Sequence, residues 1–281
     1  MIKETKPSET ILWRHLKSLP YFRAMVRAVE DSFYQGLELP EPVLDLGSGD
    51  GHFASVAFSH PLDVGVDPWW GPLLESRHLK AYRLLVQADG GRMPFPDGHF
   101  GSVVSNSVLE HIPHVEQVLE EVARVVRPGG RFVFCVPNHR FPKLLLGRQV
   151  FSKLGWKSAA EGYSRLFNRI SRHQHCDSPQ TWQERLTQVG FVIEKHWDYF
   201  DANALHRMEV GHALGIPALV CKKLLGRWVL VPAVWNLFLP YLIARRVFNS
   251  PITESGVYSF YIARRAVPSE EKPSDERPDR G

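Results

Sequence analysis

Cysteine is scarce and unpatterned in this sequence. Cys135, Cys176 and Cys221 are the three cysteines among 281 residues, and their odd number and wide spacing exclude a disulfide framework and a paired metal motif. The first twenty residues lack an uninterrupted apolar stretch and carry several charges, which is not the pattern of a signal peptide. No internal repeat is visible. The sequence therefore favours the reducing cytoplasm.

The chain carries a small excess of positive charge. The net charge is +4, and apolar residues make up 44% of the chain, as in an ordinary globular protein with its own core. The excess is concentrated between Arg140 and Arg172, where eight Lys or Arg residues face one acid, Glu161. This stretch can meet a phosphate or an anionic headgroup, or be a solvated face. The sequence contains no recognised nucleic-acid module, so no nucleic-acid partner is expected.

Short apolar runs alternate with helical patterns along most of the chain. The predicted strands are 43–46, 62–67, 83–87, 100–106, 131–136, 191–200 and 256–265. The clearest helix is 115–126, which has valines and a leucine on one face and ends at the Pro-Gly-Gly of 128–130. Another helix is expected from Ser178 to Gly190. This alternation predicts a doubly wound α/β fold whose mostly parallel sheet has helices on both faces.

The segments outside this strand–helix alternation have different patterns of apolar residues. Helical spacing of apolar residues predicts an N-terminal helical cover over 1–40. The core itself is expected over 41–200 plus 256–266, interrupted by an apolar helical insert over 201–255. The last segment, 267–281, is rich in Pro, Ser, Glu and Asp and is predicted to be disordered.

A glycine-rich loop follows the first predicted strand. It reads Gly47-Ser48-Gly49-Asp50-Gly51, with Asp45 two residues ahead. Glycines at the carboxyl end of a parallel strand let the backbone approach a ligand closely. The spacing lacks the third glycine of a dinucleotide fingerprint, and no P-loop lysine follows. Two acids at this loop suit a cationic ligand better than a pyrophosphate.

Two more acids follow the next two strands. Asp67 ends the second strand, where a carboxylate can accept hydrogen bonds from both ribose hydroxyls of an adenosine. Asp89 follows the third strand and can accept from an adenine amino group. Each also has an ordinary interpretation, because Pro68 makes Asp67 a candidate turn residue and Asp89-Gly90 is a common turn.

As a set, these motifs resemble the class I S-adenosylmethionine-dependent methyltransferases. The similarity is greatest to the methyltransferase type 11 group, which is related to ubiquinone and menaquinone biosynthesis methyltransferases. The matching stretches are VLDLGSGDGHF (43–53), VGVD (64–67), QADGGRMPFPDGHFGSVVSNSVLEHI (87–112) and VLEEVARVVRPGGRFVFCVPN (118–138). They cover about a third of the chain. One departure is Gly101, where the group usually has an aspartate.

The resemblance implies a seven-stranded sheet of order 3-2-1-4-5-7-6 with the last strand antiparallel. It also implies S-adenosyl-L-methionine as the cofactor. The cofactor-binding residues carried over from the group are Asp45, Gly47, Ser48, Gly49, Asp67, Pro68, Ala88, Asp89, Asn106 and Ser107. Of these, the glycine loop would contact the methionine part, and Asn106 and Ser107 would line the methyl-transfer side.

Methyl transfer requires a general base only if the acceptor must lose a proton. His111 and His139 are the catalytic candidates, because they follow the fourth and fifth strands; each is also a plausible structural residue. The stretch His173-Gln174-His175-Cys176-Asp177 looks like a metal motif, but its ligands are crowded and no second cluster pairs with them. No metal is therefore expected.

The insert contains seventeen residues without a charge, from Trp228 to Ala244. This run is short for a membrane span and contains Pro232 and Pro240. It predicts a helical cap, an apolar lid over a hydrophobic acceptor, or a peripheral membrane contact through 213–248.

The sequence thus predicts a cytoplasmic methyltransferase, with peripheral membrane contact as an open alternative. Its acceptor is expected to be a small, apolar or lipid-linked molecule that is methylated on oxygen or carbon. Two rival functions stay open at this point. One is a non-enzymatic S-adenosylmethionine-binding protein, and the other is an NAD-dependent oxidoreductase, which the missing fingerprint glycine disfavours.

Overall fold

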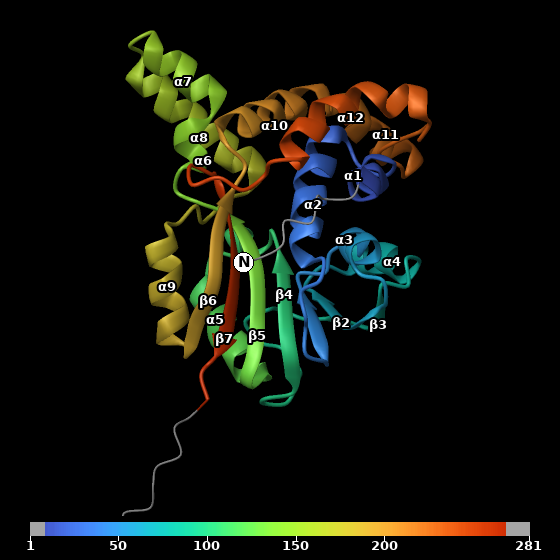
Figure 1. The fold of residues 1–281 in the computed structure, drawn as a ribbon, viewed down its shortest axis with the longest axis vertical. Helices are drawn as coiled ribbons and strands as arrows, with labels where there is room; N and C mark the ends of the chain where they lie inside the picture. The colour runs from blue at the N-terminus through green and yellow to red at the C-terminus, as the bar shows by residue number, and fades with distance from the viewer. Residues whose placement is uncertain (1–8, 268–281) are drawn as a thin grey trace, which may run out of the picture.

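The computed structural model describes residues 9–267 and contains one seven-stranded sheet (Figure 1). The strand order is β3-β2-β1-β4-β5-β7-β6, and β7 is antiparallel to both β5 and β6. This confirms the predicted fold class, strand order and antiparallel last strand. The strands are β1 (Val43–Leu46), β2 (Leu62–Asp67), β3 (Tyr82–Gln87), β4 (Phe100–Asn106), β5 (Val126–Pro137), β6 (Phe191–Tyr199) and β7 (Tyr258–Arg265).

The central strands are buried on both faces, as their continuous apolar runs predict. Every residue of β1 and β4 is buried, whereas edge strand β3 has exposed positions. On one face, α5 (Val115–Val125) packs against β5 and α9 (Pro179–Gln188) packs against β6. There Trp182 lies with its ring centre 5.2 Å from that of Phe134. Ser178 caps α9, since its hydroxyl accepts from the Thr181 amide at 3.2 Å.

Helices also cover the edge of the sheet at which the parallel strands have their carboxyl ends (Figure 1). The N-terminal helices α1 (Glu9–Leu16) and α2 (Tyr21–Tyr34) lie directly above this edge. The chain between β6 and β7 forms α10 (Ala202–Leu214), α11 (Ile216–Leu225) and α12 (Val234–Phe248), which lie beyond them. The remaining helices are α3 (His52–Ala57), α4 (Trp70–Arg77), η1 (Leu109–His111), α6 (Phe141–Leu144), α7 (Leu146–Lys153) and α8 (Lys157–Ser171).

Two further expectations concern the C-terminal tail and a membrane-spanning helix. The tail predicted to be disordered falls, from position 268 onward, outside the described residues. Among residues 9–267, no helix combines the length and the apolar content that crossing a bilayer requires.

Gly101 departs from the usual residue of the group, and the structure supplies a reason. The backbone of 40–41 crosses β4 at this point, and a Cβ atom on residue 101 would lie 2.5 Å from the Pro40 carbonyl oxygen. The Gly101 amide also donates to the Pro42 carbonyl at 3.0 Å. Any side chain here would push against backbone that cannot yield locally.

Gly101→Ala is therefore expected to lower the free energy of unfolding by about 1–3 kcal/mol, the usual cost of forcing extra volume into a packed site. Urea denaturation measures this change. Gly162→Ala is the matched control, because no atom lies within 4 Å of its Cβ position in α8. Gly162→Ala should raise the free energy of unfolding by roughly 0.5–1 kcal/mol, because alanine favours a helix more than glycine does. Equal effects of the two substitutions would contradict the steric explanation.

Candidate active site

The glycine loop joins β1 to α3 and is held against β2. The amides of Gly47 and Ser48 both donate to the Val66 carbonyl, at 2.8 and 2.9 Å. Gly47 has a φ of +77°, and a Cβ atom on it would lie 2.4 Å from Cγ1 of Val108. Glycine is required at this position for both reasons. The loop is thus a fixed turn at the carboxyl edge of the sheet.

Asp67 ends β2 directly beneath this loop. Its Oδ2 accepts from the Gly49 amide at 3.0 Å, and its Oδ1 accepts from the Trp69 amide at 2.9 Å. Burial raises the pKa of Asp67, while these two backbone hydrogen bonds lower it. Each oxygen keeps a second lone pair, so an oriented carboxylate can accept two more hydrogen bonds. Pro68 is exposed, and its carbonyl accepts from the Gln87 amide group at 3.1 Å.

Asp45 lies within β1, at the base of the same loop. Its side chain is buried, and Oδ2 accepts from the Tyr82 hydroxyl at 2.6 Å. Burial raises the pKa of Asp45 to about 6, against the hydrogen bond from Tyr82, which lowers it; the nearby Asp67 raises it further. A buried carboxyl with this pKa is poised to become fully charged when a cation arrives beside it.

Ala88 and Asp89 follow β3. The Ala88 amide donates to the Asp67 carbonyl at 3.3 Å, which places this segment beside the end of β2. Asp89 is exposed, and its Oδ1 accepts from the Gly91 amide at 2.8 Å. The turn expected at Asp89 therefore forms, and the second carboxylate oxygen stays available to a ligand.

These residues fit the adenosyl cofactor that the sequence implies. Ser48 has a buried hydroxyl oxygen without a hydrogen-bond partner in the described part of the chain. A Cβ atom on Gly49 would meet nothing closer than 4.0 Å, so the space above the loop is open. Asp67 would hold the ribose, Ala88 and Asp89 the adenine, and the loop with Asp45 the methionine part.

Asn106 ends β4 and Ser107 follows it, and both belong to a buried network that sequence reasoning missed. Its centre is Glu30 of α2, whose side chain is 0% exposed. Oε1 of Glu30 accepts from the hydroxyls of Ser107 and Tyr199, both at 3.0 Å. Oε2 accepts from the Asn106 amide group at 2.7 Å and from the Arg27 guanidinium at 2.6 Å. Four donors from three elements and one loop residue thus converge on one carboxylate.

A signal for Glu30 does exist in the sequence. Phe22, Val26 and Glu30 follow one another at intervals of four residues, so Glu30 continues the apolar stripe of α2. An acid on a buried stripe needs partners. Arg27 lies one turn earlier on the same helix, but the other partners come from β4, the residue after it and β6, and only the fold shows which they are.

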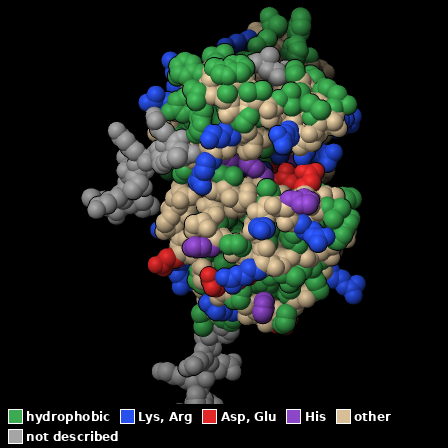
Figure 2. Space-filling model, turned by 90° about the vertical axis from the view of Figure 1, so that its right-hand side faces the viewer, with side chains coloured by type: hydrophobic (Ala, Val, Ile, Leu, Met, Phe, Trp, Pro, Cys, Tyr) green, Lys and Arg blue, Asp and Glu red, His purple; other side chains and the backbone are tan. Residues whose placement is uncertain are grey.

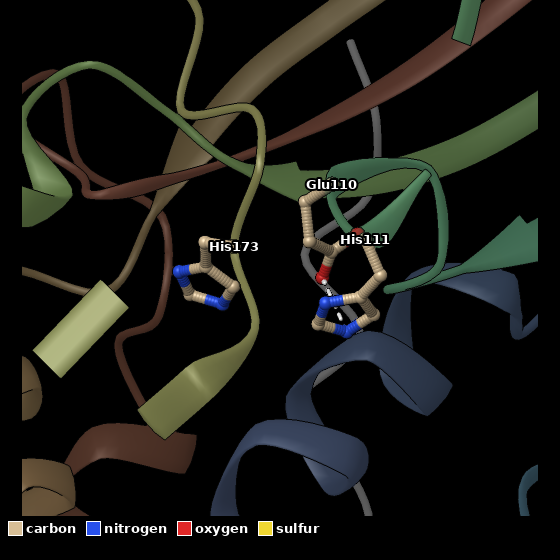
Figure 3. Close-up of side chains that lie close together, drawn as sticks. All are labelled: Glu110, His111 and His173. Atoms are coloured by element: carbon tan, nitrogen blue, oxygen red, sulfur yellow. Dashed lines mark ion pairs between the residues drawn. The ribbon is translucent and has the colours of Figure 1, made fainter. Parts of the chain in front are cut away.

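His111 lies in η1, next to Glu110 and opposite His173 (Figure 3). The His111 ring contacts the Arg172 carbonyl through Nδ1 at 3.0 Å, and its Nε2 lies 3.7 Å from Oε1 of Glu110. Glu110 is buried, and its other oxygen has no hydrogen-bond partner in the described residues. Burial raises the pKa of Glu110 to about 8 and lowers that of His111. The carboxyl is therefore largely protonated at pH 7.

The same three side chains have the donor set of a cation site, with ligand atoms within 4.8 Å of one another. In the fold, Glu110 and His111 provide the additional ligand atoms that the sequence around His173 lacks. Arg27 lowers the pKa of both Glu110 and His111, whereas Glu30, the ion-pair partner of Arg27, raises that of Glu110. With a raised pKa on Glu110 and a lowered one on His111, the cluster can also act as an acid–base group.

His139 follows β5 and is partly exposed. Its Nδ1 is buried and has no hydrogen-bond partner in the described part of the chain. Burial lowers the pKa of His139, and the charges of Arg140 and Lys143 lower it further. The imidazole is therefore neutral at pH 7 and able to accept a proton.

Known proteins resemble this chain in sequence and fold. The profile of the methyltransferase domain family matches residues 44–134. The chain is 36% identical over 142 residues to an uncharacterized methyltransferase of Mycolicibacterium gilvum, covering 47% of this chain and 51% of that protein. It is 30% identical over 185 residues to the demethylmenaquinone methyltransferase of Tropheryma whipplei, covering 61% of this chain and 75% of that protein.

A solved structure shares the fold. The S-adenosylmethionine-dependent methyltransferase of Thermotoga maritima superposes with a TM-score of 0.54 at 12% identity, covering 87% of this chain and 91% of that chain. Such low identity supports the fold alone. The chain spans about half the length of its Mycolicibacterium relative (51%) and three quarters of its Tropheryma relative (75%).

Proposed function

Because this chain belongs to the S-adenosylmethionine-dependent methyltransferases, we propose that it methylates a small, apolar, lipid-linked acceptor of the quinone type. S-adenosyl-L-methionine is its cofactor. The observation that carries the proposal is the apolar insert of α11 and α12, which lies beside the glycine loop. The name of the Tropheryma relative supports the class of acceptor.

A hollow of about 330 Å³ separates the glycine loop from this insert. Asp50 and His52 line it on the side of the loop, and Trp228, Val229 and Pro232 line it on the side of the insert. An apolar tail can lie against the insert while a polar head faces the loop. A second hollow of about 490 Å³ lies between α5 and α9, away from both the glycine loop and the insert.

When bound, the cofactor supplies an electrophilic sulfonium methyl group. The chain must then align an acceptor and, where the acceptor carbon or oxygen carries a proton, remove that proton. His139 is the stronger candidate for the base, because its ring is partly exposed and neutral. His111 is the second candidate, with one nitrogen occupied by the Arg172 carbonyl and the other facing Glu110.

The experiment that tests this function uses purified protein, methyl-labelled S-adenosylmethionine and a lipid extract of the source cell. Label is expected in the organic phase. His139→Asn should lower kcat by roughly 10²-fold with the affinity for the cofactor unchanged, as for loss of a general base. Val192→Ser, on the exposed surface of β6, is the matched control. Label confined to the aqueous or macromolecular fraction would contradict the proposed acceptor.

The pKa of Asp45 makes cofactor binding depend on pH. Its folded-state pKa of about 6 means that Asp45 is charged above pH 6 and neutral below it. The affinity for a cationic cofactor should therefore be full at pH 8 and fall by up to about tenfold per unit as the pH drops below 6. Titration calorimetry across pH 5–8 measures this. Asp45→Asn should bind weakly and without this pH dependence, whereas Asp63→Asn, on the next strand, should keep it.

A further inference from the structure

The surface of α11 and α12 is apolar where the protein meets solvent. Helix α11 contains no buried residue, and its Leu224 is 76% exposed. Helix α12 buries one stripe, which includes Leu237 and Ala244, against the N-terminal helices. Its other stripe points outward, and Trp235 there is 75% exposed. An outward stripe of this kind is not explained by packing within the chain.

The extent of this surface exceeds what a monomer ordinarily exposes. Twelve of the 26 exposed large apolar side chains in the described residues lie between Ile216 and Leu242. Together they expose apolar area on the order of 1,000 Å², whereas the largest patch on a typical monomer is about 300–600 Å². Figure 2 shows hydrophobic side chains gathered over the upper part of this side of the molecule. Patches of this size mark interaction sites.

The charged residues within this segment of the chain are all cations. From Val210 to Ile252 the chain contains no Asp or Glu. The same segment contains five cations, Lys222, Lys223, Arg227, Arg245 and Arg246. An apolar face with a cationic margin is complementary to an anionic bilayer, whose headgroups attract Lys and Arg while its interior accepts the apolar side chains.

A second copy of the chain is a poorer occupant of this face. A two-fold dimer places the same patch of both subunits in contact. The cations of one copy would then face the cations of the other, with no acid from this segment between them. Like charges facing across an interface oppose association.

Aromatic residues beside this face have the placement typical of a membrane interface. Lys222 of α11 pairs with Glu75 of α4 at 2.6 Å, so α4 lies next to α11. At the start of α4, Trp69 and Trp70 are both exposed. Tryptophans of this kind lie at the level of the headgroups, where an apolar ring also meets water.

We propose that the face formed by α11, α12 and the loop between them docks onto the surface of an anionic lipid bilayer. Docking would bring the hollow beside the glycine loop to the membrane surface. A lipid-linked acceptor could then reach the site without leaving the bilayer. The proposed function explains what docking would be for. Docking itself can be tested without it, because binding to vesicles needs neither cofactor nor turnover.

The test is flotation of the full-length protein with vesicles of phosphatidylcholine, with and without 30% phosphatidylglycerol. The protein is expected to float with the anionic vesicles at about 0.1 M salt and to be released at higher salt, because screening shortens the reach of its cations. Trp235→Ser combined with Leu239→Ser should weaken binding at least tenfold. Lys223→Gln combined with Arg246→Gln should weaken it roughly 30-fold, at about fivefold for each cation near the surface.

Leu166→Ser combined with Ile170→Ser is the matched control. These residues of α8 are exposed apolar side chains away from the face, so vesicle binding should be unchanged. Circular dichroism shows whether each variant folds. Absence of flotation, equal binding to uncharged vesicles, or a dimer that the Trp235 and Leu239 substitutions disperse would each overturn docking. Flotation without label in the organic phase would support docking and would contradict the proposed acceptor.

Discussion

Glu30→Ala is expected to lower the free energy of unfolding by about 3–5 kcal/mol, the usual cost of removing one partner from a buried charged pair. The substitution leaves the partly buried Arg27 guanidinium without its carboxylate, and it also leaves the side chains of Asn106, Ser107 and Tyr199 without an acceptor. These donors join α2 to the carboxyl ends of β4 and β6. Urea denaturation at pH 7 measures the loss.

Two variants separate this effect from a general sensitivity of the chain. Glu30→Gln keeps the size and one acceptor oxygen, so it should cost less, about 1–3 kcal/mol. Glu120→Ala removes an exposed acid from α5 and should change stability by less than about 0.5 kcal/mol. A cost below about 1 kcal/mol for Glu30→Ala would mean that water replaces the carboxylate and that the network is not structural.

Asp67→Ala is expected to weaken S-adenosylmethionine binding by roughly 10²–10⁴-fold. Two hydrogen bonds from the ribose to a charged acceptor contribute about 1.5–3 kcal/mol each, and the substitution removes both. It also removes the acceptor that fixes the Gly49 amide in the glycine loop. Titration calorimetry with the purified variant measures the change in Kd.

Asp63→Ala is the matched control for Asp67→Ala. Asp63 lies on the same strand, where its carboxylate accepts from the Val43 amide and the Arg83 guanidinium, away from the glycine loop. It should lower stability without changing the affinity of the folded protein for the cofactor. A Kd for Asp67→Ala within threefold of the unchanged protein would show that the ribose is held elsewhere.

The cofactor residues and the substrate residues differ in how far the sequence could predict them. Gly47, Asp67 and Asp89 follow consecutive strands of the sheet, and parallel strands bring their carboxyl ends to one edge. Their proximity therefore follows from local pattern alone. The residues proposed to serve the acceptor come from the segment after β5, η1 and the insert, and no local pattern relates these segments to one another.

The sequence by itself determined the α/β fold, because this depends on hydrophobic periodicity and on turn chemistry within short stretches. The strand order and the cofactor followed from the resemblance of its motifs to the class I methyltransferases. Tertiary structure alone decided that Glu30 gathers Asn106, Ser107 and Tyr199, that His173 meets Glu110 and His111, and that the backbone at Pro40 requires Gly101. It also decided which stripe of the insert faces outward. Each of these depends on contacts between residues far apart in the chain, which close packing fixes only when the whole domain assembles.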